Sequence, residues 1–196
     1  LNNSECNQIQ LPSPFPEKNF GLYIHRSIST KYIHRRNSYE KIADIIFNVY
    51  QVKPGNYLVY FPSYAYMNRV VDCIYTKYKM SNIKIQNRGM TENERSEFLK
   101  IFSGNSRNKI CAFAVMGGIF GESIDLKGEN LIGVIIVSVG LPQICLERNL
   151  IMDFFSKNHE DGFSYSYQLP GFNRVLQAAG RVIRSETDRG IAVLID

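Results

Sequence analysis

The residues best suited to chemistry lie near the end of the chain, in a segment that combines guanidinium and amide side chains. It reads Gln177-Ala-Ala-Gly-Arg-Val-Ile-Arg184. Successive residues of an α-helix turn by about 100°, so a helix over this segment would place its polar residues in one stripe. These residues are Arg174, Gln177, Arg181 and Arg184. One guanidinium group can bind two phosphate oxygens at once, and its charge stabilises the negative charge that develops during phosphoryl transfer. Arg181 and Arg184 are therefore candidate arginine fingers.

An ordinary solvated helix face is the alternative interpretation of this stripe. Two features favour a site instead. The stripe contains no carboxylate, and Gly180 removes a side chain beside Arg181, which allows close approach of another backbone or a ligand. The opposite side of the same helix is apolar and is expected to be buried. Its residues are Phe172, Val175, Leu176, Ala179, Val182 and Ile183.

Short apolar runs alternate with helical patterns along the chain, which indicates a parallel sheet with crossover helices. The candidate strands are 21–25, 57–61, 83–86, 110–115, 133–139 and 191–195. Two of them, 110–115 and 191–195, lack polar alternation, as expected of strands covered on both faces. The predicted fold class is α/β, with a mostly parallel sheet of about six strands and helices on both faces.

Helix starts are marked by residues that can cap free backbone N–H groups. The runs 37–40 and 91–94 resemble capping boxes, and Ser63 is a candidate N-cap for a third helix. Two more helices are predicted near 146–156 and 170–184. Residues 1–16 are interpreted as an irregular lead-in, followed by one domain over 17–196.

Composition narrows the class of protein. A chain of 196 residues with 44% hydrophobic residues can bury one substantial core, and its net charge of +5 favours contact with polyanions. The four cysteines form no cluster with metal-ligand spacing, so reduced thiols in a cytoplasmic protein are expected. The most apolar stretch, 131–141, is shorter than the roughly 20 residues of a membrane span, so no membrane partner is predicted.

Several segments together resemble a known family. The run 177–184 is similar to motif VI of superfamily 2 helicases, and its continuation through Thr187-Asp188-Arg-Gly190 is similar to the DinG/XPD type. The segment 118–126 resembles motif V, with Ser123 in place of the usual glycine. Residues 57–67 resemble motif IV, and the segments 13–15 and 28–35 resemble those that follow motif III. The resemblance covers 11–196 in the family's order.

This resemblance implies a RecA-like, P-loop NTPase-type three-layer sandwich that serves as the second motor domain of an ATP-dependent DNA helicase. The implied whole protein moves 5′ to 3′ and acts in DNA repair or replication. Catalytic roles are implied for Arg181, Arg184 and Gln177. Nucleotide-binding roles are implied for Gly121, Glu122, Asp125 and Gly180. Nucleic-acid contacts are implied for Lys31, Arg35, Ser63, Tyr64 and Gly118, although an ordinary serine cap explains Ser63 equally well.

The sequence contains neither a G-x-x-x-x-G-K-[ST] loop nor an Asp-Glu-Ala-His box. The resemblance therefore implies that ATP and Mg²⁺ bind in a cleft completed by a first RecA-like motor domain outside this chain, and the isolated chain is expected to be inactive. Any iron–sulfur cluster of the whole protein would belong to that other part, and no metal ligands are expected here. The implied partners are single-stranded DNA, ATP and the first motor domain. The alternative function is a non-catalytic module that binds nucleic acid or a protein.

Overall fold

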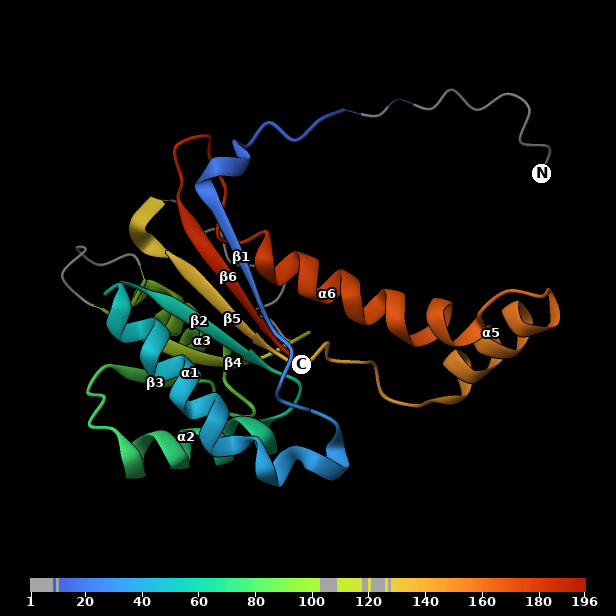
Figure 1. Cartoon of the computed structure of the whole chain (residues 1–196), viewed down its shortest axis with the longest axis horizontal. Helices are drawn as coiled ribbons and strands as arrows, with labels where there is room; N and C mark the ends of the chain where they lie inside the picture. The colour runs from blue at the N-terminus through green and yellow to red at the C-terminus, as the bar shows by residue number, and fades with distance from the viewer. Residues whose placement is uncertain (1–8, 10, 103–108, 118–119, 121–125, 127) are drawn as a thin grey trace.

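Six parallel strands form one sheet in the computed structural model, which describes residues 9, 11–102, 109–117, 120, 126 and 128–196 (Figure 1). The strands are β1 Phe20–His25, β2 Tyr57–Phe61, β3 Ile83–Ile85, β4 Cys111–Val115, β5 Gly133–Val137 and β6 Gly190–Ile195. Their order across the sheet is β1-β6-β5-β2-β4-β3, and every pairing is parallel. All six predicted strands are confirmed. The largest difference is at β5, which ends at Val137 instead of at 139.

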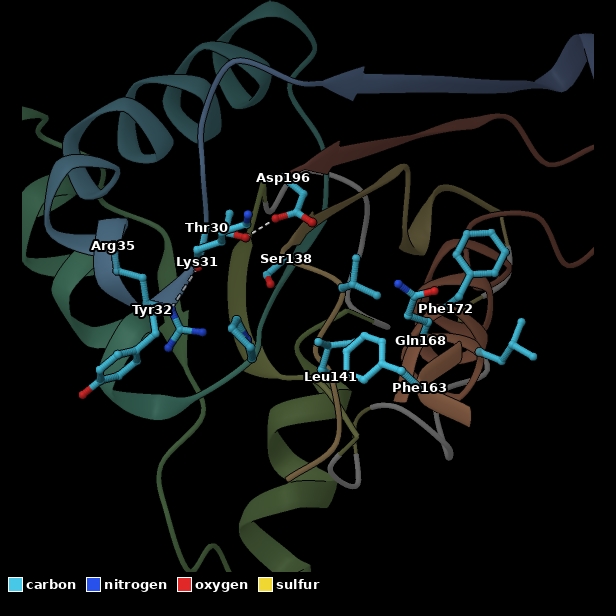
Figure 2. Close-up of a pocket in the computed structure, with 13 residues that line it drawn as sticks. Thr30, Lys31, Tyr32, Arg35, Ser138, Leu141, Phe163, Gln168, Phe172 and Asp196 are labelled. Atoms are coloured by element: carbon cyan, nitrogen blue, oxygen red, sulfur yellow. Dashed lines mark hydrogen bonds between the residues drawn. The ribbon is translucent and has the colours of Figure 1, made fainter. Parts of the chain in front are cut away.

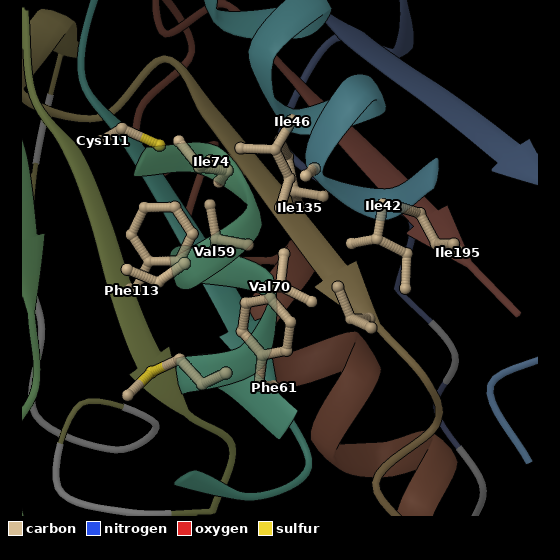
Figure 3. Packing of buried hydrophobic residues seen from close by; sticks show 14 of the residues in the cluster. Ile42, Ile46, Val59, Phe61, Val70, Ile74, Cys111, Phe113, Ile135 and Ile195 are labelled. Atoms are coloured by element: carbon tan, nitrogen blue, oxygen red, sulfur yellow. The ribbon is translucent and has the colours of Figure 1, made fainter. Parts of the chain in front are cut away.

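Helices cover both faces of this sheet, as predicted. On one face lie α1 Tyr39–Val52 and α2 Tyr64–Lys77, and on the other lie α3 Glu92–Lys100 and α6 Leu169–Ala179. Side chains of β2 alternate between the two layers, with Val59 and Phe61 packed under α1 and α2 (Figure 3). Leu58 and Tyr60 pack in the layer of α3 and α6. This alternation divides the core into two apolar layers.

A projection stands at the outer end of α6, away from the sheet (Figure 1). It consists of α5 Leu146–Lys157 and a π-helical turn, Ser164–Gln168. Phe155 stacks on Tyr165 with ring centroids 4.2 Å apart, and this contact ties the turn to α5. None of the helices in the described part of the chain has the length and apolar character needed to cross a membrane.

All three predicted helix starts are confirmed, but only two of the helices are capped as predicted. Thr91 and Glu94 form the predicted capping box, and the Ser63 hydroxyl caps α2 by accepting the N–H of Tyr66 at 3.3 Å. The predicted box between Asn37 and Glu40 does not form, because α1 begins at Tyr39 with Ser38 as its N-cap, which puts Lys41 instead of Glu40 at the third helical position. The Ser38 hydroxyl donates to the Arg35 carbonyl at 2.7 Å. The same hydroxyl lies 2.6 Å from the hydroxyl of Tyr66.

The last predicted helix ends five residues early, because α6 stops at Ala179. The N–H groups of Arg181 and Val182 bond to carbonyls three residues back, at 3.3 and 3.2 Å, which tightens the final turn. Farther on, the N–H of Arg184 donates to the Asp188 carboxylate at 2.7 Å. The prediction that Arg181 and Arg184 share a helical stripe with Gln177 is therefore wrong, since both arginines lie in the turn region that leads to β6.

The predicted apolar face of α6 also needs correction. Gly171, Val175 and Ala178 are buried against the sheet, whereas Phe172 and Leu176 are 49% and 53% exposed. The spacing of the buried residues, i, i+4 and i+7, sets the rotation of α6 and turns the two larger side chains outward. They line cavities at the surface instead of filling the core.

A first prediction tests the apolar layer beneath α1. Replacing the fully buried Ile46 with alanine leaves a cavity, so the free energy of unfolding should fall by about 2–5 kcal/mol. Val52→Ala on the same helix removes an 85% exposed side chain and should change it by less than about 0.5 kcal/mol. Urea unfolding followed by circular dichroism measures both, and equal losses would contradict the layer assignment.

Candidate functional site

A small polar cavity lies where α6 packs beside the loop that follows β4. It has a volume of about 270 Å³, and its lining includes Gln177, Arg174 and Arg148. Gly117 contributes backbone from the loop and has a φ of +75°. A Cβ at this glycine would lie 3.3 Å from the guanidinium carbon of Arg174, so a larger residue would be strained and would crowd that side chain.

Two further guanidinium groups act on this region from the turn after α6. Arg181 is buried and Arg184 is exposed. Burial raises the pKa of the Tyr60 hydroxyl, and the positive charges of Arg181 and Arg184 act in the opposite direction. Tyr60 lines the cavity beside Gln177, and its hydroxyl donates to the Phe120 carbonyl at 2.8 Å. Of the three predicted catalytic residues, Gln177 lines this cavity, whereas Arg181 and Arg184 influence Tyr60 through their charges and are not among the lining residues.

The turn that carries these arginines is organised by Asp188, which is 4% exposed. Its carboxylate accepts hydrogen bonds from Arg184, Ser185 and Gly128. Burial raises the pKa of this carboxyl, but the hydrogen bonds from Ser185, Arg184 and Gly128 together lower it by more, so its pKa lies below the ordinary value. The carboxylate is therefore held in its charged form.

A larger groove runs along the edge of the sheet where the parallel strands end (Figure 2). Its volume is about 820 Å³. One wall carries Lys31, Tyr32 and Arg35, and the opposite wall carries Phe163 and Phe172. The groove floor includes residues that directly follow three strands. These are Pro62 after β2, Ser138 after β5 and Asp196 after β6.

The basic wall of this groove is held in place by buried contacts. Thr30 is 2% exposed and donates its hydroxyl to the Asp196 carboxylate. The Nε of Arg35 donates to the Thr30 carbonyl at 3.1 Å, and its guanidinium carbon lies 4.8 Å from the ring centre of Tyr66. Lys31 remains exposed at the groove surface. A fixed guanidinium beside an exposed ammonium group suits the binding of a polyanion.

The structure separates the predicted nucleic-acid residues into two groups. Lys31 and Arg35 line the groove. Ser63 and Tyr64 do not line it: the first caps α2, and the ring centre of the second lies 5.2 Å from the guanidinium carbon of Arg88. The predicted residue Gly118 lies outside the described residues.

The predicted nucleotide-binding residues are placed only in part. Gly121, Glu122 and Asp125 lie outside the described residues. Gly180 lines a separate, largely apolar cavity of about 340 Å³, together with Leu176, with Phe15 and with Phe20 at the start of β1. Gly180 therefore lines this apolar cavity and is not among the residues that line the cavity of Gln177.

Several residues of these cavities are not predicted by the motifs. Arg174 lies outside the matching motif, but it lines the same cavity as Gln177 and donates to the Gly140 carbonyl at 3.3 Å. Phe172 lines the groove, although its position in the helical period predicts a core residue. The cluster of aromatic residues within 163–172 was a usable signal in the sequence, whereas nothing local marks Tyr60. Within the described residues, no cluster of His, Cys, Asp and Glu could hold a metal ion.

Helicases are among the known proteins to which this chain is similar. A family model described as the helicase C-terminal domain matches residues 46–196. A probable ATP-dependent helicase of Methanocaldococcus jannaschii is 29% identical over 203 residues, which cover 95% of this chain and 30% of that protein. The ATP-dependent DNA helicase XPD of Sulfolobus acidocaldarius is 27% identical over 183 residues, which cover 90% of this chain and 31% of that protein.

Solved structures extend the likeness to the fold. The structure of apo XPD matches with a TM-score of 0.72 at 22% identity, over 91% of this chain and 36% of that one. This match confirms the predicted RecA-like α/β fold. The chain spans about a third of the length of these relatives. On the family match, the chain belongs to the helicase C-terminal domain family and is a motor domain related to XPD-type superfamily 2 helicases.

Proposed function

We propose that this chain is the second motor domain of an ATP-dependent DNA helicase, in which α6 connects a nucleotide site to a single-stranded DNA groove. The observation that carries this proposal is that α6 lines both cavities. Gln177 lies in the polar cavity, and Phe172 lies in the basic groove. The DinG/XPD type, the 5′ to 3′ direction, a role in repair or replication and a cytoplasmic location rest on the motif resemblance.

In the proposed nucleotide site, the guanidinium groups of Arg181 and Arg184 bind the γ-phosphate of ATP held against the first motor domain. Their planar charge stabilises the negative charge that spreads over the phosphoryl oxygens in the transition state. The amide of Gln177 orients a phosphate oxygen or the attacking water. Mg²⁺ bound with ATP would neutralise further phosphate charge, and its protein ligands are expected on the first motor domain.

In the proposed DNA site, the two walls of the groove have different tasks. Lys31 and Arg35 contact backbone phosphates, and Phe163 and Phe172 offer ring faces to the bases. Such a surface binds a single strand with little sequence preference, because every base has a face that can stack and every nucleotide has a phosphate. A change in the position of α6 on nucleotide binding would move the aromatic wall relative to the basic wall, which links the two sites.

The proposal predicts that purified 1–196 has no DNA-stimulated ATPase activity, because the lysine and the Mg²⁺ ligand of the other motor domain are needed to complete the site. A coupled assay with ATP and oligo(dT) measures this activity. Turnover by the isolated chain would contradict the assignment as a second motor domain and would place a complete nucleotide site within these 196 residues.

The arginine assignment is tested in the full-length protein. Replacing Arg181 or Arg184 with alanine should lower kcat for ATP hydrolysis by about 10³-fold, with a smaller change in KM, because the lost charge acts mainly in the transition state. Lysine should restore little activity, since an ammonium group cannot reproduce the planar fork. Steady-state kinetics at saturating oligo(dT) gives both constants.

Arg69→Ala is the matched control for these variants. Arg69 is exposed on α2, in the helical layer on the other side of the sheet, so its loss should leave kcat unchanged. Because Arg181 is buried, its variants also need a thermal unfolding curve to show that the domain is folded at the assay temperature. Normal kcat in both alanine variants would refute the arginine-finger role.

The groove assignment predicts two different binding signatures in the full-length protein. Lys31→Ala should weaken oligo(dT) binding and reduce the slope of log K against log salt by about 0.7, the value for one phosphate contact on a single strand. Phe172→Ala should weaken binding by about 1–3 kcal/mol without changing the slope. Fluorescence anisotropy at several salt concentrations measures both quantities.

Lys79→Ala serves as the charge control for the groove. Lys79 is exposed just beyond the end of α2, and this helix runs away from the edge of the sheet that holds the groove. Its loss should leave affinity and salt slope unchanged. If the Lys31 and Phe172 variants bind as the Lys79 variant does, the DNA strand does not occupy this groove.

A further inference from the structure

The turn between α6 and β6 is built around a single buried carboxylate. One oxygen of Asp188, Oδ2, accepts the backbone N–H groups of Arg184 at 2.7 Å and Ser185 at 2.8 Å. The other, Oδ1, accepts the Ser185 hydroxyl at 2.5 Å and the N–H of Gly128 at 3.1 Å. A buried charge is costly unless such donors surround it, so this arrangement specifies one conformation of the turn.

These donors come from two places that matter for the proposed reaction. One is Arg184 itself, whose backbone is fixed directly by the carboxylate. The other is Gly128, which has a φ of +65° and begins a short helical turn, Gly128–Asn130, three residues after Asp125 of the motif V-like segment. The Asp188 side chain therefore ties the backbone of one candidate arginine finger to the segment that follows the motif V-like loop.

The residues two positions before and after Asp188 have different surroundings from it. The side chain of Glu186, two residues earlier, is exposed, and its backbone carbonyl accepts the Asn19 amide at 3.0 Å. Gly190, two residues later, already starts β6, where a Cβ would lie 2.1 Å from Cγ1 of Val182. The Asp188 carboxylate is therefore enclosed by the turn, whereas the nearby Glu186 carboxylate is exposed. Glu186 can serve as the control position for variants of Asp188.

We propose that Asp188 is a positioning residue, which acts on ATP hydrolysis by fixing the backbone of Arg184 so that the guanidinium group meets the γ-phosphate. This inference rests on the proposed function. Without the carboxylate, the N–H groups of Arg184 and Ser185 lose their acceptor, and the turn takes several conformations. The arginine then spends less time in the reactive position, which lowers the rate of the chemical step more than the affinity for ATP.

The test uses Asp188→Asn in the full-length protein. Asparagine keeps the shape and one acceptor oxygen, but its NH₂ group faces N–H donors, so part of the hydrogen bonding is lost. We expect kcat to fall by about 10²-fold, as for a small misplacement of a reacting group, with little change in KM for ATP. Glu186→Gln removes a neighbouring exposed carboxylate and should leave kcat unchanged.

A double-mutant cycle with Arg184→Ala separates positioning from general stability. If Asp188 acts through Arg184, the double variant should be no slower than Arg184→Ala alone. A residue needed only for stability would lower kcat further in that background, and such a result would overturn the inference. Urea unfolding of all variants shows that each is folded under assay conditions.

The outcomes also separate this inference from the proposed function. Normal kcat in Arg184→Ala overturns the arginine-finger role and the positioning role with it. Impaired Arg184→Ala with normal Asp188→Asn overturns only the positioning role. If Asp188→Asn does not fold, Ser185→Ala, which removes one of the carboxylate's hydrogen bonds, replaces it in the cycle. It should lower kcat less than loss of the arginine does and should add nothing in the Arg184→Ala background; an additive loss would again overturn the inference.

Discussion

Two adjacent parallel strands must be joined by a connection that crosses a face of the sheet. Between β5 and β6 this connection includes α6, and the same helix both covers the sheet and lines the two candidate cavities. Gly171, Val175 and Ala178 form its buried stripe, and a Cβ at Gly171 would lie 3.2 Å from both Val139 and Leu141. The glycine lets the start of α6 lie close to the end of β5. Because this stripe faces the sheet, Gln177 on another side of the helix lines the polar cavity and Phe172 lines the basic groove.

The strands could be predicted because their signals are local. A run such as 133–137 is apolar throughout, and its short length and β-branched residues suit a strand covered on both faces. The Thr91 capping box is also local, since both partners lie within four residues. At 37–40 a similar pattern failed because Asn37 ends the preceding helical turn and Ser38 takes the N-cap position, which puts Lys41 where the box needs an acceptor side chain.

The end of α6 shows where local signals are not enough. Val182 and Ile183 continue the helical period of apolar residues and are buried as predicted. They lie, however, in the turn after α6 and not in the helix. Two constraints end the helix. Asp188 accepts backbone N–H groups that a continued helix would use, and it also accepts the N–H of Gly128, 60 positions earlier. Gly190 brings β6 close to the Val182 side chain and the carbonyl of Ile132. Asp188 and Gly190 can both be read from the sequence. That they stop the helix from continuing past Ala179 follows only from the tertiary fold.

The candidate site was predictable in its residue types and less so in its geometry. Lys31 and Arg35 follow from a motif, but the wall that carries them is attached to the end of β6 by the hydrogen bond of Thr30 to Asp196, 166 positions later. Arg174 lies outside the motif, although helical spacing alone places it beside Gln177. Contacts between distant segments decide which of these residues share a cavity, and one sequence without structure cannot supply them.

The placement of both cavities on α6 makes coupling between them mechanically simple. Phe172 and Gln177 are five residues apart, about 7.5 Å along the helix axis, so no long relay of side chains is needed. The helix is bounded at its start by the π-helical turn Ser164–Gln168 and at its end by Gly180. Both are points where backbone geometry adjusts more easily than within a regular helix. In the proposed mechanism, a ligand that shifts α6 in one cavity would also move a wall of the other, and the backbone would adjust at the two ends of the helix.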